Sequence, residues 1–338
     1  MSPKPSPSRR SLASGGIAVA VVLIGIATLT MVACDPAVPP TSTTTTTRVL
    51  SSTSTTSTTV ASTTTTPVTG ATVDKTHLPV GDGKYSSTTP KRGSIYTCQS
   101  TFNGGGASSK GPWFNSDGTT YDSTKKGEVD GSVSWPNQLT TTVSGTTRTF
   151  TGNDLPNHTT GKFPISSTDS DVYPYDRNPN TIASQALSVK IPASPTVATK
   201  PTCIRGEVGI LLSGAALFDA LDAGGRDAVA WEAQDHCEGH PQNTGVYHYH
   251  SLTTCIADPG TGQSALLGYA YDGFGIYGMR GEDGKELTNA DLDECHGRTS
   301  PVMWDGKLVT MYHYVATREY PYTVGCFKGT PSQNTFSG

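Results

Sequence analysis

The sequence has little charge and no cluster of basic residues. Only 15% of its 338 residues are charged, and 24 Lys and Arg stand against 28 Asp and Glu, for a formal net charge of −4. Domains that bind nucleic acid usually gather Lys and Arg on one face. The composition therefore predicts no nucleic-acid partner.

Several sequence signatures of enzymes are also absent. The chain contains no G-x-S-x-G elbow, no H-E-x-x-H pair and no phosphate-binding loop. Beyond its N-terminal region it has no apolar run long enough to cross a bilayer. The sequence thus lacks the common signatures of serine hydrolases, zincin proteases and P-loop nucleotidases.

The N-terminus reads as a targeting segment. Lys4, Arg9 and Arg10 precede an apolar run over residues 15–32, the order of charge and hydrophobicity found in export signals. We expect residues 1–33 to be a signal peptide, which places the protein outside the cytoplasm.

The end of that run, Met31-Val32-Ala33-Cys34, resembles the lipobox of bacterial lipoproteins. The resemblance implies cleavage before Cys34, lipidation of Cys34 and anchoring to the cell membrane. Ser8–Leu12 also resembles a twin-arginine export signal, so the Sec and twin-arginine routes both remain open. The alternatives to a cleaved lipoprotein are a plain Sec signal and an uncleaved membrane anchor.

A linker and one large domain follow. Residues 34–75 are dominated by Thr and Ser and have too few apolar groups to offset the entropy of ordering, so we expect a disordered stalk. Residues 76–338 are enough for a single globular domain. With 37 Gly and 23 Pro in the chain, we expect that domain to be loop-rich and mostly β, with a β-rich α+β fold as the alternative.

The cysteines predict disulfides. If Cys34 is lipidated, six of the seven remain, an even number that in an exported domain indicates disulfide bonds. A faint repeat of the order D-x-C-x-G-basic, Y-H-Y, C begins at Asp235 and again at Asp293. The repeat favours the pairs Cys237–Cys255 and Cys295–Cys326, which leaves Cys98–Cys203 as the third. Chance similarity and cross-pairing between the copies are the alternatives.

Local patterns predict mainly strands. Residues 139–143 and 146–150 flank Ser144-Gly145 and should form a β-hairpin with a two-residue turn. Residues 210–212 and 266–271 should be buried strands. Short helices are expected within residues 219–232 and 288–295.

The strongest pattern for a functional site is Gly245-Val246-Tyr247-His248-Tyr249-His250. Alternate side chains of a strand point to opposite faces, so His248 and His250 should project together and the two tyrosines the other way. Neutral imidazole is the commonest metal ligand. The pattern predicts a metal site, whereas the structural alternative is a Tyr/His strand packed against a neighbouring sheet.

Further histidines could complete that site. His240 lies in a turn just before the strand and is expected to close a three-histidine set that suits Zn or Cu. Additional candidate ligands are Asp235, His236 and His313; Asp235 could instead cap a turn or orient an imidazole.

Acidic residues and one further histidine provide other candidates for a site. Asp272, in a run rich in Gly and aromatic residues, is the candidate catalytic carboxylate, with turn capping as the alternative. The acidic residues from Asp283 to Glu294 do not have EF-hand spacing and fit solvated turns better than calcium. His158 is a weaker candidate for a site.

Taken together, many ordered segments resemble the YHYH-domain family of bacterial exported proteins over residues 153–329. That family has no established activity, so the resemblance implies a domain type and not a reaction. The segments that carry it are Pro156–His158, Asn178–Asn180, Asp235–Pro241, Gly245–His250, Gly268–Gly278, Leu292–Gly297 and Tyr320–Gly329.

These observations lead to two functional hypotheses. The first is a surface lipoprotein that binds one transition metal through His240, His248 and His250, with enzymatic activity undecided. The second is a non-catalytic module that binds glycans or a protein partner at the cell surface, in which the Tyr/His strand is structural.

Overall fold

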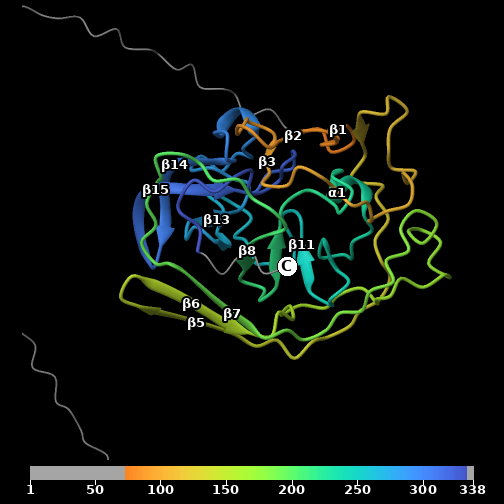
Figure 1. The fold of residues 1–338 in the computed structure, drawn as a ribbon, viewed down its shortest axis with the longest axis horizontal. Helices are drawn as coiled ribbons and strands as arrows, with labels where there is room; N and C mark the ends of the chain where they lie inside the picture. Colours follow the sequence, from red (N-terminus) through yellow and green to blue (C-terminus); the bar gives the residue numbers. More distant parts are fainter. Residues whose placement is uncertain (1–72, 333–338) are drawn as a thin grey trace, which may run out of the picture. The chain divides into compact units, whose positions relative to one another are not determined.

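The computed structural model describes residues 73–332, which are mostly β-structure (Figure 1). The signal segment 1–33, Cys34 and nearly all of the linker 34–75 lie outside the described residues. The centre of the fold is an eight-stranded sheet in the order β10 (Gly239–Pro241), β11 (Tyr247–Tyr249), β9 (Ala216–Phe218), β8 (Glu207–Leu211), β12 (Leu266–Ala270), β13 (Gly275–Tyr277), β15 (Lys307–Val315) and β14 (Gly297–Trp304).

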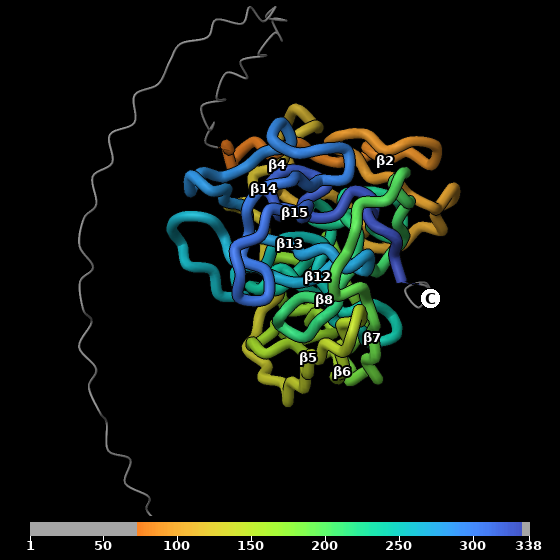
Figure 2. The backbone as a smooth tube through the Cα atoms, turned by 90° about the vertical axis from the view of Figure 1, so that its left-hand side faces the viewer, coloured from red at the N-terminus to blue at the C-terminus, as the bar shows by residue number. Residues whose placement is uncertain are grey.

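This sheet is built from two halves with the same strand pattern. In the first half β8 and β9 are antiparallel, β9 and β11 are parallel, and β11 and β10 are antiparallel. In the second half β12 and β13, β13 and β15, and β15 and β14 repeat the same three relations. Figure 2 shows β8, β12, β13, β15 and β14 following one another across the sheet.

The register between the halves is symmetric. At the junction, antiparallel β8 and β12 pair Ile210 with Tyr269, with Leu211 opposite Gly268 and Gly209 opposite Ala270. Further out, His240 pairs with His248 in the first half and Arg298 pairs with His313 in the second. The faint sequence repeat is therefore a structural duplication about a pseudo-twofold axis.

A separate three-stranded antiparallel sheet packs against the second half. It contains β5 (Leu139–Ser144), β6 (Thr147–Gly152) and β7 (Leu187–Pro192). The predicted hairpin is confirmed, but its turn is Gly145-Thr146, one residue later than expected, because Ser144 still pairs with Thr147. Gly145 has a φ of 57°, and glycine supplies that positive φ at the first turn position without steric cost.

Two small sheets and two short helices complete the fold. The sheets pair β1 (Leu78–Pro79) with β4 (Thr120–Tyr121) and β2 (Tyr85–Ser86) with β3 (Ile95–Tyr96). Where helices were expected, the structure has only α1 (Ala228–Trp231) and the 3₁₀ turn η1 (Asn289–Asp291). Asp227 caps α1 by accepting a hydrogen bond from the N–H of Ala230.

The hydrophobic core follows both halves of the central sheet. Tyr247 and Tyr249 of β11 and Tyr314 of β15 are completely buried. Three disulfides join the surrounding loops, and they are the pairs that the repeat predicts: Cys98–Cys203, Cys237–Cys255 and Cys295–Cys326.

Within residues 73–332, no helix has both the length and the apolar character needed to span a bilayer. Disulfides persist in oxidising compartments. The three disulfides therefore fit a domain that is exported to such a compartment.

Candidate metal centre

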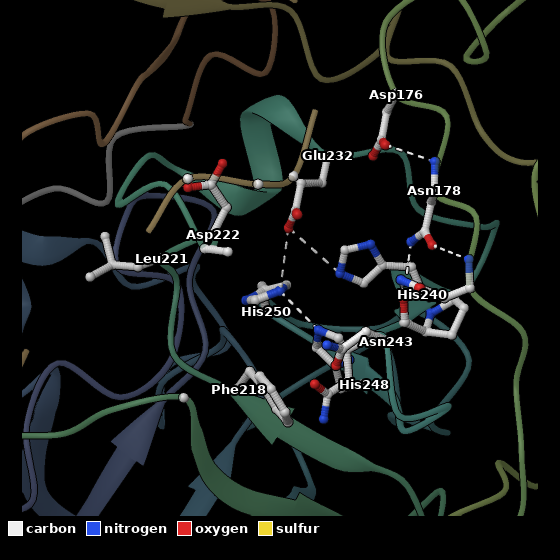
Figure 3. Close-up of a pocket in the computed structure, with 18 of the residues that line it drawn as sticks. Asp176, Asn178, Phe218, Leu221, Asp222, Glu232, His240, Asn243, His248 and His250 are labelled. Atoms are coloured by element: carbon white, nitrogen blue, oxygen red, sulfur yellow. Dashed lines mark hydrogen bonds and ion pairs between the residues drawn. The ribbon is translucent and has the colours of Figure 1, made fainter. Parts of the chain in front are cut away.

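The paired strands β10 and β11 bring three histidines together. His240 on β10 lies directly opposite His248 on β11, and His250 follows β11 on the same face. The ring centroids of His240 and His248 are 4.6 Å apart, those of His248 and His250 4.8 Å, and those of His240 and His250 5.3 Å. Figure 3 shows the three rings converging at one side of a pocket.

Backbone carbonyls fix the orientation of two of these rings. Nδ1 of His248 lies 3.2 Å from the carbonyl oxygen of Val246, and Nδ1 of His250 lies 2.5 Å from that of Asp219. A carbonyl oxygen only accepts hydrogen bonds, so Nδ1 of each ring carries the proton and Nε2 presents a lone pair. The two Nε2 atoms are 3.1 Å apart.

That separation matches the spacing of ligands around one metal ion. Two nitrogens bound tetrahedrally to zinc at about 2.0–2.1 Å lie about 3.3–3.4 Å from each other. Two buried lone pairs that face each other at 3.1 Å repel unless a cation attracts both. The arrangement of His248 and His250 therefore favours a cation between them.

A carboxylate that sequence reasoning missed faces the same point. One oxygen of Glu232 lies 3.6 Å from Nε2 of His240 and 3.6 Å from Nε2 of His250. Neither ring nitrogen of His240 makes a hydrogen bond to any described residue. Glu232 directly follows the apolar helix α1, and an acidic residue bordering an apolar segment was the only signal in the sequence.

Burial controls the charge of these groups. His240, His248 and His250 are each 3–4% exposed, and Glu232 is 8% exposed. Burial lowers the pKa of all three imidazoles, to about 4 for His250, and neighbouring histidines lower it further for His240 and His248. Burial also raises the pKa of Glu232, with smaller contributions from Asp176 and Asp222. The histidines are thus neutral, the form that binds metal.

The cluster lies at the floor of a cavity of about 860 Å³. The ring of Phe218 stacks on His248 with centroids 4.0 Å apart, which holds that imidazole in place. Cavities of this size accommodate small organic ligands. The histidines therefore combine the features of a metal site with access for a ligand.

Asp235, a further candidate ligand close to the motif, makes hydrogen bonds that stabilise the local fold. Asp235 accepts hydrogen bonds from the N–H groups of Gly161, Cys237 and Gly239 and from the hydroxyl of Tyr247. These contacts cap the turn before β10 and involve none of the three histidines.

His236 and His158 also lie apart from the three clustered histidines. His236 is exposed, and its Nε2 lies 3.2 Å from the hydroxyl of Thr159. His158 lies 2.5 Å from the hydroxyl of Tyr249, on the opposite face of the strand from His248. Both approach the Cys237–Cys255 disulfide, whose sulfurs are already bonded to each other.

Asp272 and His313 belong to the second half of the sheet. Asp272 accepts hydrogen bonds from the Tyr314 hydroxyl and the Gly329 N–H, and it does not line the cavity. His313 packs edge-on against Tyr277, with Nδ1 3.1 Å from the carbonyl oxygen of Met311. The structure does not bring His313 to the other three histidines, because it occupies the position in β15 that His248 occupies in β11.

Comparison with known proteins identifies one family. The family model described as YHYH protein matches residues 188–287, which include Glu232 and all three clustered histidines. No curated protein and no solved structure matches the chain. The resemblance seen in the sequence is thus confirmed for this segment.

Proposed function

We propose that this protein, which carries a YHYH domain over residues 188–287, binds one transition metal ion through Nε2 of His240, His248 and His250. The observation that carries the proposal is the pair of facing Nε2 lone pairs, 3.1 Å apart and fixed by backbone carbonyls. His240, whose ring nitrogens have no hydrogen-bond partner among residues 73–332, would supply the third nitrogen. The Glu232 carboxylate lies beside these nitrogens.

Zinc and copper are the ions that this donor set suits. Imidazole ligands are preferred by both, and three protein nitrogens with a further position toward a pocket are typical of catalytic zinc. Bound there, such an ion would polarise a ligand or activate water at the cavity floor. Glu232, 3.6 Å from two of the imidazole nitrogens, would neutralise part of its charge.

The proposal is tested by elemental analysis of protein purified without a His-tag. The wild type should hold about one equivalent of metal, and His248→Ala and His250→Ala should lose it and still fold. Two variants serve as controls. His77→Ala removes an exposed histidine far from β11 in sequence, and Tyr247→Ala acts on the same strand but the opposite face.

The controls separate loss of a ligand from loss of folding. Tyr247→Ala should keep the metal but cost about 3–5 kcal/mol in unfolding free energy, because it deletes a fully buried aromatic ring. Full metal content in the two histidine variants, or a wild type that never holds metal, would contradict the proposal. The second result would favour a surface module that binds a glycan or protein partner.

We also propose that Cys34 anchors the protein to the cell membrane. Support comes from the sequence of residues 31–34 and from the three disulfides, which fit an exported domain. Intact-mass analysis of native protein should find an acylated chain that begins at Cys34, and Cys34→Ala should lose both acylation and cleavage. Unchanged processing of that variant would refute the anchor.

A further inference from the structure

The cavity above the three histidines has one arginine on the side of His250. Arg205 lines the cavity and precedes Gly206, whose N–H donates a 2.8 Å hydrogen bond to the carboxylate of Asp219. The carbonyl oxygen of the same Asp219 is the partner of Nδ1 of His250. Two hydrogen bonds made by Asp219 thus connect the backbone next to Arg205 with the proposed metal ligand His250.

A second arginine lies on the side of His240. Arg177 lines the cavity and precedes Asn178, whose side-chain amide donates a 3.0 Å hydrogen bond to the carbonyl oxygen of Pro241, the residue after His240. The two arginines thus border the cluster from different segments of the chain. Both are exposed, and neither makes an ion pair or a hydrogen bond through its guanidinium to any residue in 73–332. The guanidinium carbon of Arg177 lies 5.5 Å from the centroid of the Tyr173 ring, a cation–π contact that leaves its N–H groups without an acceptor among these residues.

The acidic residues of the cavity wall are, by contrast, already engaged. Asp176 accepts hydrogen bonds from the N–H groups of Asn178 and Ala233. Asp219 accepts from the N–H groups of Gly206 and Leu221.

Asp222 is bound even more fully. It accepts hydrogen bonds from the N–H groups of Gly224 and Arg226 and forms an ion pair with the Arg226 guanidinium at 2.6 Å. Glu232, the remaining acid of the wall, faces His240 and His250. The positive charges of the wall that remain available to a ligand are therefore those of Arg177 and Arg205.

A glycine loop forms a third side of the cavity. Gly104, Gly105 and Gly106 all have positive φ, and a Cβ on Gly106 would lie 2.7 Å from an oxygen of Glu232. Glycine is thus required for this loop to approach the carboxylate so closely. The N–H groups of the three glycines donate to no acceptor among the described residues, and exposed backbone N–H groups in such loops bind anions.

We propose that this cavity binds an anionic ligand through a carboxylate or phosphate group held between Arg177 and Arg205 and facing the metal. The inference rests on the proposed function, because the metal would form the floor beneath that group. Guanidinium groups bind both kinds of oxyanion in a bidentate manner. Phe102, Phe218 and Leu221 supply apolar surface for the rest of the ligand.

The test uses three probes that share a benzene ring and differ in charge: phenylphosphonate, benzoate and neutral benzamide. Calorimetric titration of metal-loaded full-length protein should show that the two anions bind and that benzamide binds at least about tenfold more weakly. Arg177→Gln and Arg205→Gln should each weaken anion binding by about tenfold, the expected loss of one charge-assisted hydrogen bond. Each of these arginine variants should retain its metal.

Matched variants decide between this site and general charge effects. Arg205→Lys should restore part of the affinity, and Arg92→Gln, which removes an exposed arginine outside this cavity, should change nothing. If the double Gln variant binds the anions as the wild type does, or if benzamide binds equally well, the inference is overturned even though metal analysis still supports the proposed function. If the wild type holds no metal yet binds anions through the arginines, the proposed function fails and the anion site stands.

Discussion

The two halves of the central sheet share a scaffold but not a site. In each half an aspartate accepts hydrogen bonds from the N–H groups two and four residues later, Asp235 in the first half and Asp293 in the second. Each also accepts a hydrogen bond from a strand tyrosine, Tyr247 or Tyr312. The duplicated elements therefore keep the interactions that form the turn and join it to the strand.

The halves differ at the positions that face the cavity in the first half. His240 corresponds to Arg298, and His250 corresponds to Val315, by register with the paired strands. The guanidinium of Arg298 lies 3.4 Å from the carboxylate of Glu282, beside His313. The second half thus carries a permanent positive charge, the guanidinium of Arg298, at the position where we propose a metal ion in the first half. The two halves therefore keep the same scaffold and differ in the residues of the site.

The largest expected effect comes from converting the first half into the second. The double variant His240→Arg and His250→Val should lose more than about a hundredfold in metal affinity, since two of three proposed ligands disappear. Competition with a chromogenic chelator measures this. The variant should fold, because Arg298 and Val315 are accommodated at the equivalent positions.

The matched change in the second half is His313→Ala, which should leave metal content unchanged. Metal loss in that variant would show that the halves share one site. Retention of metal by the double variant would place the ligands elsewhere.

A second comparison concerns buried carboxyls. Asp154 accepts a hydrogen bond from the Ala216 N–H of β9, and its other oxygen has no hydrogen-bond partner in the described chain. Burial, aided by Glu207, raises its pKa to about 8, against about 3.9 in an unfolded chain. Asp272 of the second half, bonded to Tyr314 and two N–H groups, has a pKa raised by burial to about 6.

The sign of the pH effect follows from those pKa values. Between about pH 4 and 8 the folded state holds a proton on Asp154 that the unfolded state has lost. The contribution of this proton to the free energy of unfolding is therefore complete below pH 4 and is lost progressively as the pH rises to 8. Asp154→Asn should therefore gain about 1.4 kcal/mol per pH unit over the wild type, or about 3 kcal/mol between pH 6 and 8. Urea unfolding at several pH values measures the difference.

Asp272→Asn provides the contrast. Its proton is lost by about pH 6, so the difference in stability between this variant and the wild type should not change between pH 7 and 9. Parallel slopes for Asp154→Asn and the wild type would mean that Asp154 is ionised in the folded protein.

The smallest effect is expected from removing one hydroxyl in each half. Tyr247→Phe should cost about 2 kcal/mol, because its partner Asp235 is buried and forms no ion pair with any described residue. Tyr312→Phe should cost about 1 kcal/mol, because Asp293 also forms an ion pair with Lys328 at 2.8 Å. Thermal unfolding measures both, and equal costs would show that the two turns are energetically equivalent.

Local sequence patterns predicted much of the first half. Strict alternation over residues 247–250 was enough to place His248 and His250 on one face and the tyrosines on the other. The repeated order of D-x-C-x-G, Y-H-Y and Cys predicted which cysteines pair. The first inference depends on the local geometry of a strand, and the second depends on the internal repeat.

The remaining features depend on long-range packing. Glu232 reaches the histidines only because the chain after α1 returns beside β10, which no local periodicity indicates. His313 was expected as an extra ligand, but the parallel pairing of β13 with β15 holds it in the other half. The pairing of β8 with β12, which creates the symmetry, likewise joins strands separated in the chain by β9, α1, β10 and β11.

The pairing of β13 with β15 also determines which fragment of the chain can stand alone. The family match ends at residue 287, after β13 but before β14 and β15. A fragment limited to the matched segment would leave β13 with an unpaired edge, would leave Cys203 without its partner Cys98, and would lack the Cys295–Cys326 disulfide. Exposed edge strands recruit other chains, so the smallest unit that we expect to stay monomeric extends past Cys326 and includes both halves.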